Sequence, residues 1–196
     1  MNMEEEKIFH QEYEESPFVS YFSNSYPFYE YHGQWYFYRL FDNTTYELGP
    51  NSMIEAYSWD FGKHNYSANK MEFPEALRND AKWIEVAKQF PYWMAVQGQN
   101  NRYVMAQIRL NAENEYGNLM YDKSTQECQF IERFTESVGF RPLVVTNEYV
   151  LCHCYHGEWD KYVNEEMLDN TNKQKLVALM KAKAEANPLI IKYYFK

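Results

Sequence analysis

The sequence alternates short aromatic runs with turn residues, and this alternation constrains the fold more than any other feature. Between Pro27 and Gly62 the runs are PFYEY, WYFYR, TTYEL and MIEAYS, separated by HGQ, LFDN and GPNS. Aromatic and β-branched residues favour strands, whereas clusters of Gly, Asn, Pro and Ser favour turns. The segment therefore predicts four short antiparallel strands joined by tight turns.

The same plan recurs twice farther along the chain. A second unit reads YWMAVQ, RYVMAQIRL, EYGNLMYD and ECQFIERF, and a third reads RPLVV, YVLCHCY and, after a helical stretch, LIIKYYF. Repeated four-stranded units of about 40 residues are typical of β-propeller blades. We therefore predict an all-β fold with inserted helices: a partial β-propeller of about three blades, each an antiparallel four-stranded sheet, with only three strands recognisable in the last.

Two stretches break the strand pattern with a helical spacing of apolar residues. Residues 73–90 and residues 172–186 each carry apolar side chains on one helical face. We expect Thr171 or Asn170 to cap the second helix, because short polar side chains at this position accept hydrogen bonds from the first free N–H groups. We expect both helices to be insertions in the blade pattern.

The chain length of 196 residues suits one sizeable core. We predict a single domain, residues 1–196, that consists of an N-terminal segment (1–22), a first blade (23–63), a helical insertion (64–91), a second blade (92–134) and an incomplete last blade (140–196) with its helix at 172–186.

Charge and hydropathy exclude several classes of function. A formal net charge of -9 disfavours binding to nucleic acid. No apolar run approaches the roughly 20 residues that span a bilayer, and the first residues, MNMEEEK, do not read as a secretion signal. The seven glycines form no phosphate-binding pattern, so we expect no nucleotide cofactor.

Several spaced features resemble one known family of propellers. The stretch from Tyr31 to Lys63 matches its hairpin and strand motifs, NLMYDKSTQE resembles its central hairpin, and NPLIIKYYFK resembles its final strand. The matching residues of the first stretch are Tyr31, Gly33, Tyr36, Phe41, Asn43, Thr44, Tyr46, Tyr57, Asp60, Phe61, Gly62 and Lys63. From about Phe18 onward the chain is similar to the C-terminal half of six-bladed, TolB-like β-propeller proteins of the Bacteroidetes type.

This resemblance carries implications for location and partners. Family members are about twice as long and carry a lipoprotein or secretion signal, which implies a periplasmic or cell-surface location if the natural protein is longer. Three blades alone leave two blade faces uncovered. A homodimer with six blades, or pairing with a separate N-terminal half, would cover them, and residues 7–22 could add a strand to the open edge or lie over it.

The stretch VLCHCYHGEWD concentrates cysteine and histidine. In a strand, Cys152, Cys154 and His156 point to one side, and His153 and Tyr155 to the other. Zinc sites usually take paired ligands from a tight turn plus a second pair elsewhere, and the sequence has no second pair. Buried strand cysteines behave as small apolar residues. We therefore predict packing and assign no metal, cofactor or catalytic residue.

The residues after this strand are the best candidates for a binding surface. In the expected loop GEWDKY, we expect Trp159 and Tyr162 to be exposed, with Asp160 between them. The sequence thus favours a non-catalytic module that binds a protein or glycan partner. The alternative is a hydrolase or lyase that acts on carbohydrate or peptide through carboxylates such as Asp60, Glu158 and Asp160 at the propeller mouth.

Overall fold

The structure, a computed structural model, describes residues 27–38, 42–65, 93–109, 116–155, 158–181 and 189–195. The chain divides into two compact units, Met1–Ala95 with Arg109–Asn114 and Val96–Ile108 with Glu115–Lys196, and each is described by itself. The predicted N-terminal segment 1–22 and the predicted helix at 73–90 lie outside the described residues.

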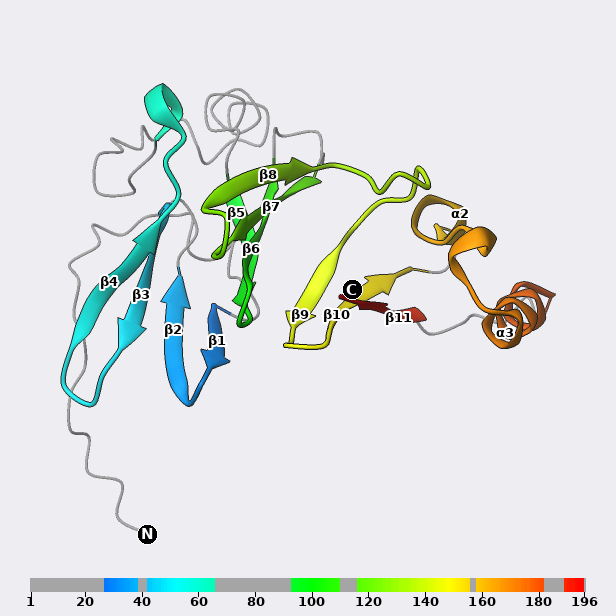
Figure 1. Cartoon of the computed structure of the whole chain (residues 1–196), viewed down its shortest axis with the longest axis horizontal. Helices are drawn as coiled ribbons and strands as arrows, with labels where there is room; N and C mark the ends of the chain where they lie inside the picture. Colours follow the sequence, from blue (N-terminus) through cyan, green and yellow to red (C-terminus); the bar gives the residue numbers. More distant parts are fainter. Residues whose placement is uncertain are drawn as a thin grey trace, which may run out of the picture. The chain divides into compact units, whose positions relative to one another are not determined.

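The first unit contains one antiparallel four-stranded sheet with the strand order β1-β2-β3-β4 (Figure 1). The strands are β1 (Phe28–Tyr31), β2 (Gln34–Tyr38), β3 (Thr44–Leu48) and β4 (Met53–Ser58), followed by the short 3-10 helix η1 (Gly62–His64). Gly33 has a φ of 75° in the β1–β2 turn, a conformation that glycine adopts without steric cost. The four strands predicted from the aromatic runs are confirmed.

A second four-stranded sheet has the order β5-β6-β7-β8. Its strands are β5 (Trp93–Gln99), β6 (Tyr103–Arg109), β7 (Tyr116–Asp122) and β8 (Glu127–Ile131). Gly98 lets this sheet approach the third one closely, because a Cβ at that position would lie 3.0 Å from Val145 Cγ2.

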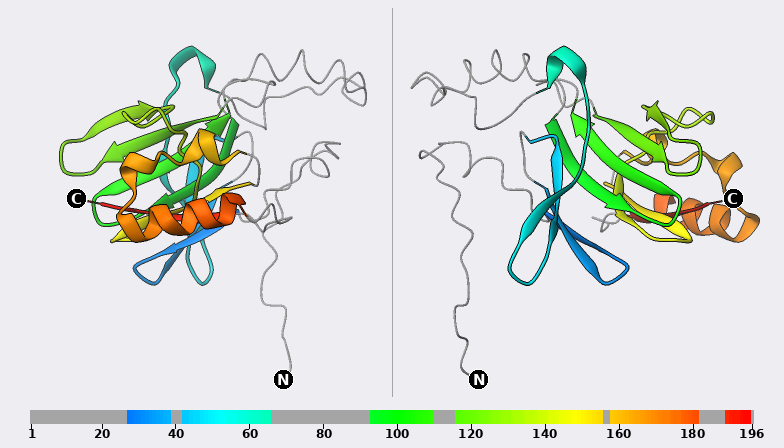
Figure 2. Two further views of the ribbon diagram at one scale, coloured as in Figure 1. Left: turned by 90° about the vertical axis from the view of Figure 1, so that its right-hand side faces the viewer. Right: turned by 60° about the vertical axis from the view of Figure 1, so that its left-hand side comes forward.

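The third sheet has three strands in the order β11-β10-β9 and carries the helices of the second unit. The elements are β9 (Pro142–Val145), β10 (Tyr149–Cys154), α2 (Trp159–Tyr162), η4 (Glu165–Met167), α3 (Asn170–Lys181) and β11 (Leu189–Tyr194). Figure 2 shows the second unit from two further directions. Two four-stranded sheets and a three-stranded one confirm the prediction of a partial propeller with inserted helices.

The core of the second unit lies on one face of β10. Val150, Cys152 and Cys154 alternate with less buried neighbours, as the two-residue period of a strand requires. Met105 and Phe140 pack with Val150 and Cys152. A second cluster joins Cys154 with Trp159 and Leu176, so it fastens α2 and α3 to the same strand.

Helix α3 starts slightly earlier than predicted. Asp169 supplies the cap: its Oδ1 accepts a hydrogen bond of 2.8 Å from Asn172 N, and its backbone O accepts one of 2.9 Å from Lys173 N. The predicted caps, Thr171 and Asn170, are wrong because the Asp169 carboxylate already satisfies the first free N–H group. The described helix ends at Lys181, and the rest of the predicted range 172–186 lies outside the described residues.

Two leucines of α3 give a matched test of this packing. Leu176 is 8% exposed and contacts the Cys154 cluster, whereas Leu179 is 41% exposed. We expect Leu176→Ala to lower the free energy of unfolding by about 2 to 4 kcal/mol, because it removes buried methyl groups and leaves a cavity. Leu179→Ala should cost less than about 0.5 kcal/mol. Urea denaturation followed by circular dichroism measures both, and equal losses would contradict the described packing.

Candidate functional site

The predicted surface residues lie in α2 rather than in a loop. Trp159 is 7% exposed and packs with Cys154 and Leu176, so the predicted exposure of Trp159 is wrong. A single helical turn directs the indole back onto β10, where it buries a large apolar area. Tyr162 is partly exposed, and the side chain of Asp160 lies outside the described set. The binding role of these residues stays a prediction.

Tyr162 belongs to a cluster that the sequence did not reveal. The Arg141 guanidinium lies between two tyrosine rings, 5.3 Å from the Tyr116 centroid and 5.1 Å from the Tyr162 centroid. Glu158 Oε2 is 3.9 Å from Arg141 Nη1. These four residues, named here the Arg141 cluster, come from the start of β7, the residue before β9, the residue before α2 and the end of α2.

Close backbone packing positions Tyr162 in this cluster. A Cβ on Gly139 would lie 2.8 Å from Tyr162 Cε1, and Gly139 N donates a 2.7 Å hydrogen bond to Lys161 O. Tyr193 OH donates a 2.9 Å hydrogen bond to Tyr162 O. The absence of a side chain at residue 139 therefore lets the last turn of α2 lie directly against this segment.

The guanidinium of Arg141 is partly desolvated and under-bonded. Its side chain is 20% exposed, and the described residues offer it only the 3.9 Å approach of Glu158, with no hydrogen bond. Glu158 also accepts a 3.2 Å hydrogen bond from Lys161 Nζ. Because five N–H donors of a guanidinium seek acceptors, the Arg141 cluster retains capacity to bind an anionic group.

The imidazole of His153 lies close enough to Arg141 for the positive charge of the guanidinium to affect its pKa. Burial, and secondarily the positive charge of Arg141, lower the pKa of His153, while Glu158 acts in the opposite direction. Its Nδ1 is buried and lacks a hydrogen-bond partner among the described residues. The Tyr155 ring packs edge-on against the imidazole at 4.9 Å. Burial chiefly raises the pKa of Tyr162, so its hydroxyl stays protonated.

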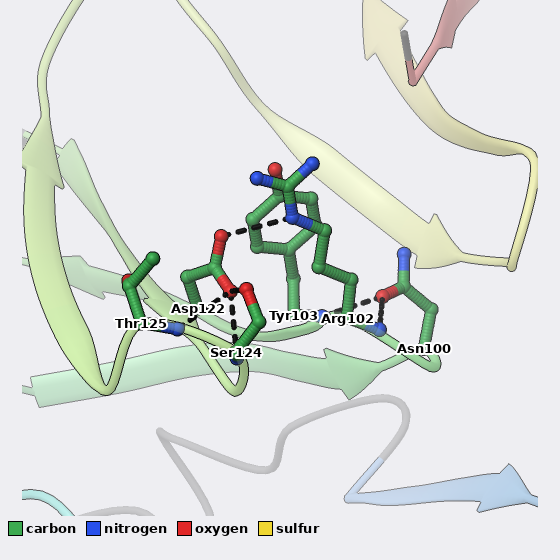
Figure 3. Close-up of polar contacts among 6 residues, drawn as sticks. All are labelled: Asn100, Arg102, Tyr103, Asp122, Ser124 and Thr125. Atoms are coloured by element: carbon green, nitrogen blue, oxygen red, sulfur yellow. Dashed lines mark hydrogen bonds and ion pairs between the residues drawn. The ribbon is translucent and has the colours of Figure 1, made fainter.

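The β5–β6 and β7–β8 turns form a second polar cluster, in which the side chains bind one another and the backbone (Figure 3). Asn100 Oδ1 accepts hydrogen bonds from Arg102 N at 2.9 Å and Tyr103 N at 2.6 Å. Asp122 Oδ1 accepts from Ser124 Oγ at 2.5 Å, and Asp122 Oδ2 accepts from Arg102 Nε at 2.9 Å. We name these residues, with Thr125, the hairpin cluster.

Lys123 and two asparagines extend the hairpin cluster to neighbouring turns. Lys123 Nζ donates to Gln99 Oε1 at 2.8 Å and to Asn100 O at 2.7 Å, and burial lowers the pKa of Lys123. Asn100 Nδ2 donates to Thr146 O at 3.0 Å, and Asn101 N donates to Asn147 Oδ1 at 2.9 Å. These contacts hold the β5–β6, β7–β8 and β9–β10 turns together, so this end is structural.

The enzymatic alternative uses Asp60, Glu158 and Asp160, and the structure describes the side chains of the first two. Both already bind other groups. Asp60 Oδ1 accepts from Gly62 N at 2.8 Å and from Asn65 Nδ2 at 2.6 Å. The Gly62 hydrogen bond is the main cause that lowers the pKa of Asp60, which suits a turn-forming anion and not a general acid. Glu158 is engaged by Lys161 and Arg141.

The cysteines serve packing, as predicted. Cys152 and Cys154 are buried on the inward face of β10, and burial raises the pKa of Cys152 to about 12. His153 faces the opposite side, while His156 lies outside the described residues. Within the described ranges, no group of three or more His, Cys, Asp and Glu residues could hold a metal ion.

Thiol labelling tests this assignment. Cys128 is exposed, whereas Cys152 and Cys154 are buried. We expect a water-soluble disulfide reagent to modify one thiol per chain in the folded protein and three after unfolding, because attack requires an accessible thiolate. Cys128→Ser should remove the native-state reaction. Rapid modification of two or more thiols in the folded protein would contradict the packing role.

Asp122 should make the stability of the hairpin cluster depend on pH. The Ser124 hydroxyl is the main cause that lowers the pKa of Asp122 from 3.8 to about 2. Because the pKa of Asp122 is lower in the folded state, its ionised form stabilises the fold at pH values above its ordinary pKa of 3.8. This stabilisation is lost as the pH falls toward about 2. Asp122→Asn should therefore destabilise at pH 6, and its difference from wild type should shrink between pH 4 and pH 2. A constant difference in urea denaturation across that range would refute this role.

No helix in the described part of the chain is long and apolar enough to cross a membrane.

Comparisons with known proteins place the chain in a family. The comparison with curated proteins found no match. Among solved structures, the chain is similar to a protein from Bacteroides fragilis described as a candidate exported protein, with 15% identity and a TM-score of 0.48. The alignment covers 86% of this chain and 49% of that protein, so the chain spans about half its length. The model of the family described as 6-bladed beta-propeller, DUF5128, matches residues 2–152. The chain therefore belongs to this six-bladed β-propeller family.

Proposed function

We propose that the chain is a non-catalytic binding module that recognises a carboxylate-bearing ligand at the Arg141 cluster. The observation that carries this proposal is the guanidinium held between Tyr116 and Tyr162, which donates no hydrogen bond to the described residues. Tyr162 is one of the surface residues that the sequence indicated, and the cluster gives that surface a specific chemistry.

The chemistry of the cluster selects for a planar anion. A guanidinium can form two parallel hydrogen bonds with a carboxylate, and the two tyrosine rings restrict its orientation before the ligand arrives. Among the described side chains, Lys161 and Arg141 carry two positive charges close to the one negative charge of Glu158. Partial burial strengthens the attraction because water screens it less.

The surroundings suit an acidic glycan or an acidic peptide segment. Tyr155 is exposed next to His153 and offers a flat ring on which a sugar or an apolar side chain can lie. The two ligand types share the carboxylate and differ in what covers this ring. An uncharged sugar would leave the Arg141 donors unsatisfied, so we expect weak binding of neutral glycans.

The non-catalytic assignment rests on how the described carboxylates are used. Asp60 holds a turn, and Glu158 pairs with Lys161 and lies 3.9 Å from Arg141, so neither resembles the protonated acid that glycoside hydrolysis requires. Hydrolysis or β-elimination of a carbohydrate or peptide is the alternative, and turnover of a bound ligand would reveal it.

The family resemblance supports a further proposal about context. The motifs from Tyr31 to Lys63 and the ending NPLIIKYYFK resemble those of TolB-like propellers, at the position of their C-terminal half. We propose a periplasmic or cell-surface location, where relatives with a secretion or lipoprotein signal reside. The reading frame upstream of Met1 tests this, and a frame without further blades or a signal would contradict it.

Binding measurements with matched arginine variants test the ligand site. We expect a panel of uronate oligosaccharides, acidic peptides and neutral sugars to yield a carboxylate ligand by calorimetry. Arg141→Ala should weaken its binding at least about tenfold, since a charge-assisted hydrogen bond contributes about 1.5 to 3 kcal/mol. Arg141→Lys should recover only part of the loss, because lysine lacks the planar fork.

Arg102→Ala is the matched control. Arg102 also lies over a tyrosine, 4.9 Å from the Tyr103 centroid, but belongs to the hairpin cluster and already binds Asp122. Equal effects of Arg102→Ala and Arg141→Ala would refute the site. Cleavage of the ligand that disappears in Glu158→Gln would replace the binding role with the enzymatic alternative.

A further inference from the structure

Asn118 of β7 is a buried polar residue next to the Arg141 cluster. It is 1% exposed, and its Nδ2 donates one hydrogen bond of 2.7 Å to Phe140 O and one of 3.3 Å to Ile131 O. Ile131 is the last residue of β8, and Phe140 lies two residues before the start of β9. One amide group therefore holds both ends of residues 132–141, which we name the β8–β9 connection.

The β8–β9 connection has the short-range hydrogen bonds of a tight turn. Phe134 N donates to Val138 O, and Ser137 N donates to Phe134 O, both at 2.9 Å. These bonds lie within the connection and shape it. The two hydrogen bonds from Asn118 differ from them, because they join the ends of the connection to the second sheet.

The hydrogen bond to Phe140 bears directly on Arg141. The Phe140 carbonyl and the Arg141 nitrogen belong to one planar peptide unit, so fixing the carbonyl also fixes the plane from which Arg141 continues. Asn118 and Tyr116 are two residues apart in β7, so their side chains lie on the same face of the strand. One strand thus supplies a ring of the Arg141 cluster and the contact that places the guanidinium 5.3 Å from the centroid of that ring.

The orientation of the Asn118 amide is determined by these two carbonyls. A half-turn of the amide would aim Oδ1 at two carbonyl oxygens, so Nδ2 must face them. Asn118 Oδ1 is then buried without a hydrogen-bond partner among the described residues. A buried acceptor of this kind destabilises a fold, so the value of the amide lies in what its two N–H groups hold in place.

We propose that Asn118 is a positioning residue that holds the Arg141 guanidinium between Tyr116 and Tyr162. It acts through the backbone of Phe140 and, being buried, does not itself meet a ligand. Its effect on binding rests on the function proposed for the Arg141 cluster. A guanidinium that is already in place loses less conformational freedom when an anion arrives, which strengthens binding.

Gln107 of β6 offers a matched control. β6 and β7 are neighbours, and Lys123 N donates to Arg102 O at 2.8 Å at one end of the pair. Continuing the antiparallel register from these two residues places Gln107 opposite Asn118, on the same face of the sheet. Gln107 is 4% exposed, and its Nε2 has no hydrogen-bond partner among the described residues. Asn118→Ala and Gln107→Ala therefore each remove a buried amide, but the Gln107 amide donates to no described carbonyl.

NMR of the Arg141 side chain tests the positioning role without a ligand. The two tyrosine rings shift the Arg141 Nε–H signal, and Arg141→Lys identifies this signal by its loss. We expect Asn118→Ala to move the signal toward that of an exposed arginine, and Gln107→Ala to leave it in place. Asn118→Ser should give an intermediate shift, because a hydroxyl has one proton and can bond only one carbonyl. If Asn118→Ala does not fold, Asn118→Ser provides the comparison.

Calorimetry tests the consequence for binding, with an oligogalacturonate and a glutamate-rich peptide as acidic probes. Asn118→Ala should weaken the binding of a probe about three- to tenfold, which corresponds to the ordering of one additional side chain. In the Arg141→Ala background the same change should alter binding by less than about twofold, because the group that Asn118 positions is gone.

The two experiments separate this role from the proposed function. If no acidic probe binds the wild-type chain but Asn118→Ala displaces the Arg141 signal, the binding function fails and the positioning role stands. An Arg141 signal that stays in place in both Asn118 variants, or that Gln107→Ala displaces equally, would overturn the positioning role. Equal weakening of binding by Asn118→Ala with and without Arg141 would overturn it as well.

Discussion

The two-sided character of β10 determines much of the second unit. β10 pairs with both β9 and β11, and its two-residue period directs Val150, Cys152 and Cys154 inward. On that inward face, Val150 and Cys152 pack with Met105 and Phe140. Cys154 packs with Trp159 and Leu176 of the helices. Its opposite face must then lie outward, so one alternation both builds the core and creates an unfilled surface.

The strands could be predicted from the sequence, but the Arg141 cluster could not. Aromatic runs and turn residues are local signals, and the inward direction of Cys152 followed from periodicity alone. Tyr116, Arg141 and Tyr162 are far apart in the chain and meet only after the sheets have formed. The burial of Trp159 escaped prediction for the same reason, because α2 folds back onto β10 through a tertiary contact.

The polar residues at the two ends of these strands have different roles. In the hairpin cluster, Asn100 and Asp122 accept the backbone N–H groups of their own turns, so local geometry satisfies the side chains. Asn and Asp in turns were visible in the sequence, although their links between turns were not. At Arg141 the partners are rings and one distant carboxylate, which restrain the guanidinium without saturating it. An incomplete shell of this kind can accept a ligand, whereas a complete one stabilises the fold.

His153 lies on the exposed face of the third sheet, close to Arg141. It pairs with Ile190 across β10 and β11, and its pKa is lowered first by burial and then by the positive charge of Arg141. Both causes disfavour the protonated imidazole, so the positive charge at this end of the sheet lies on Arg141 and Lys161. The same two-residue period that directs Cys152 and Cys154 into the core therefore places a neutral ring, and not a third cation, beside the guanidinium.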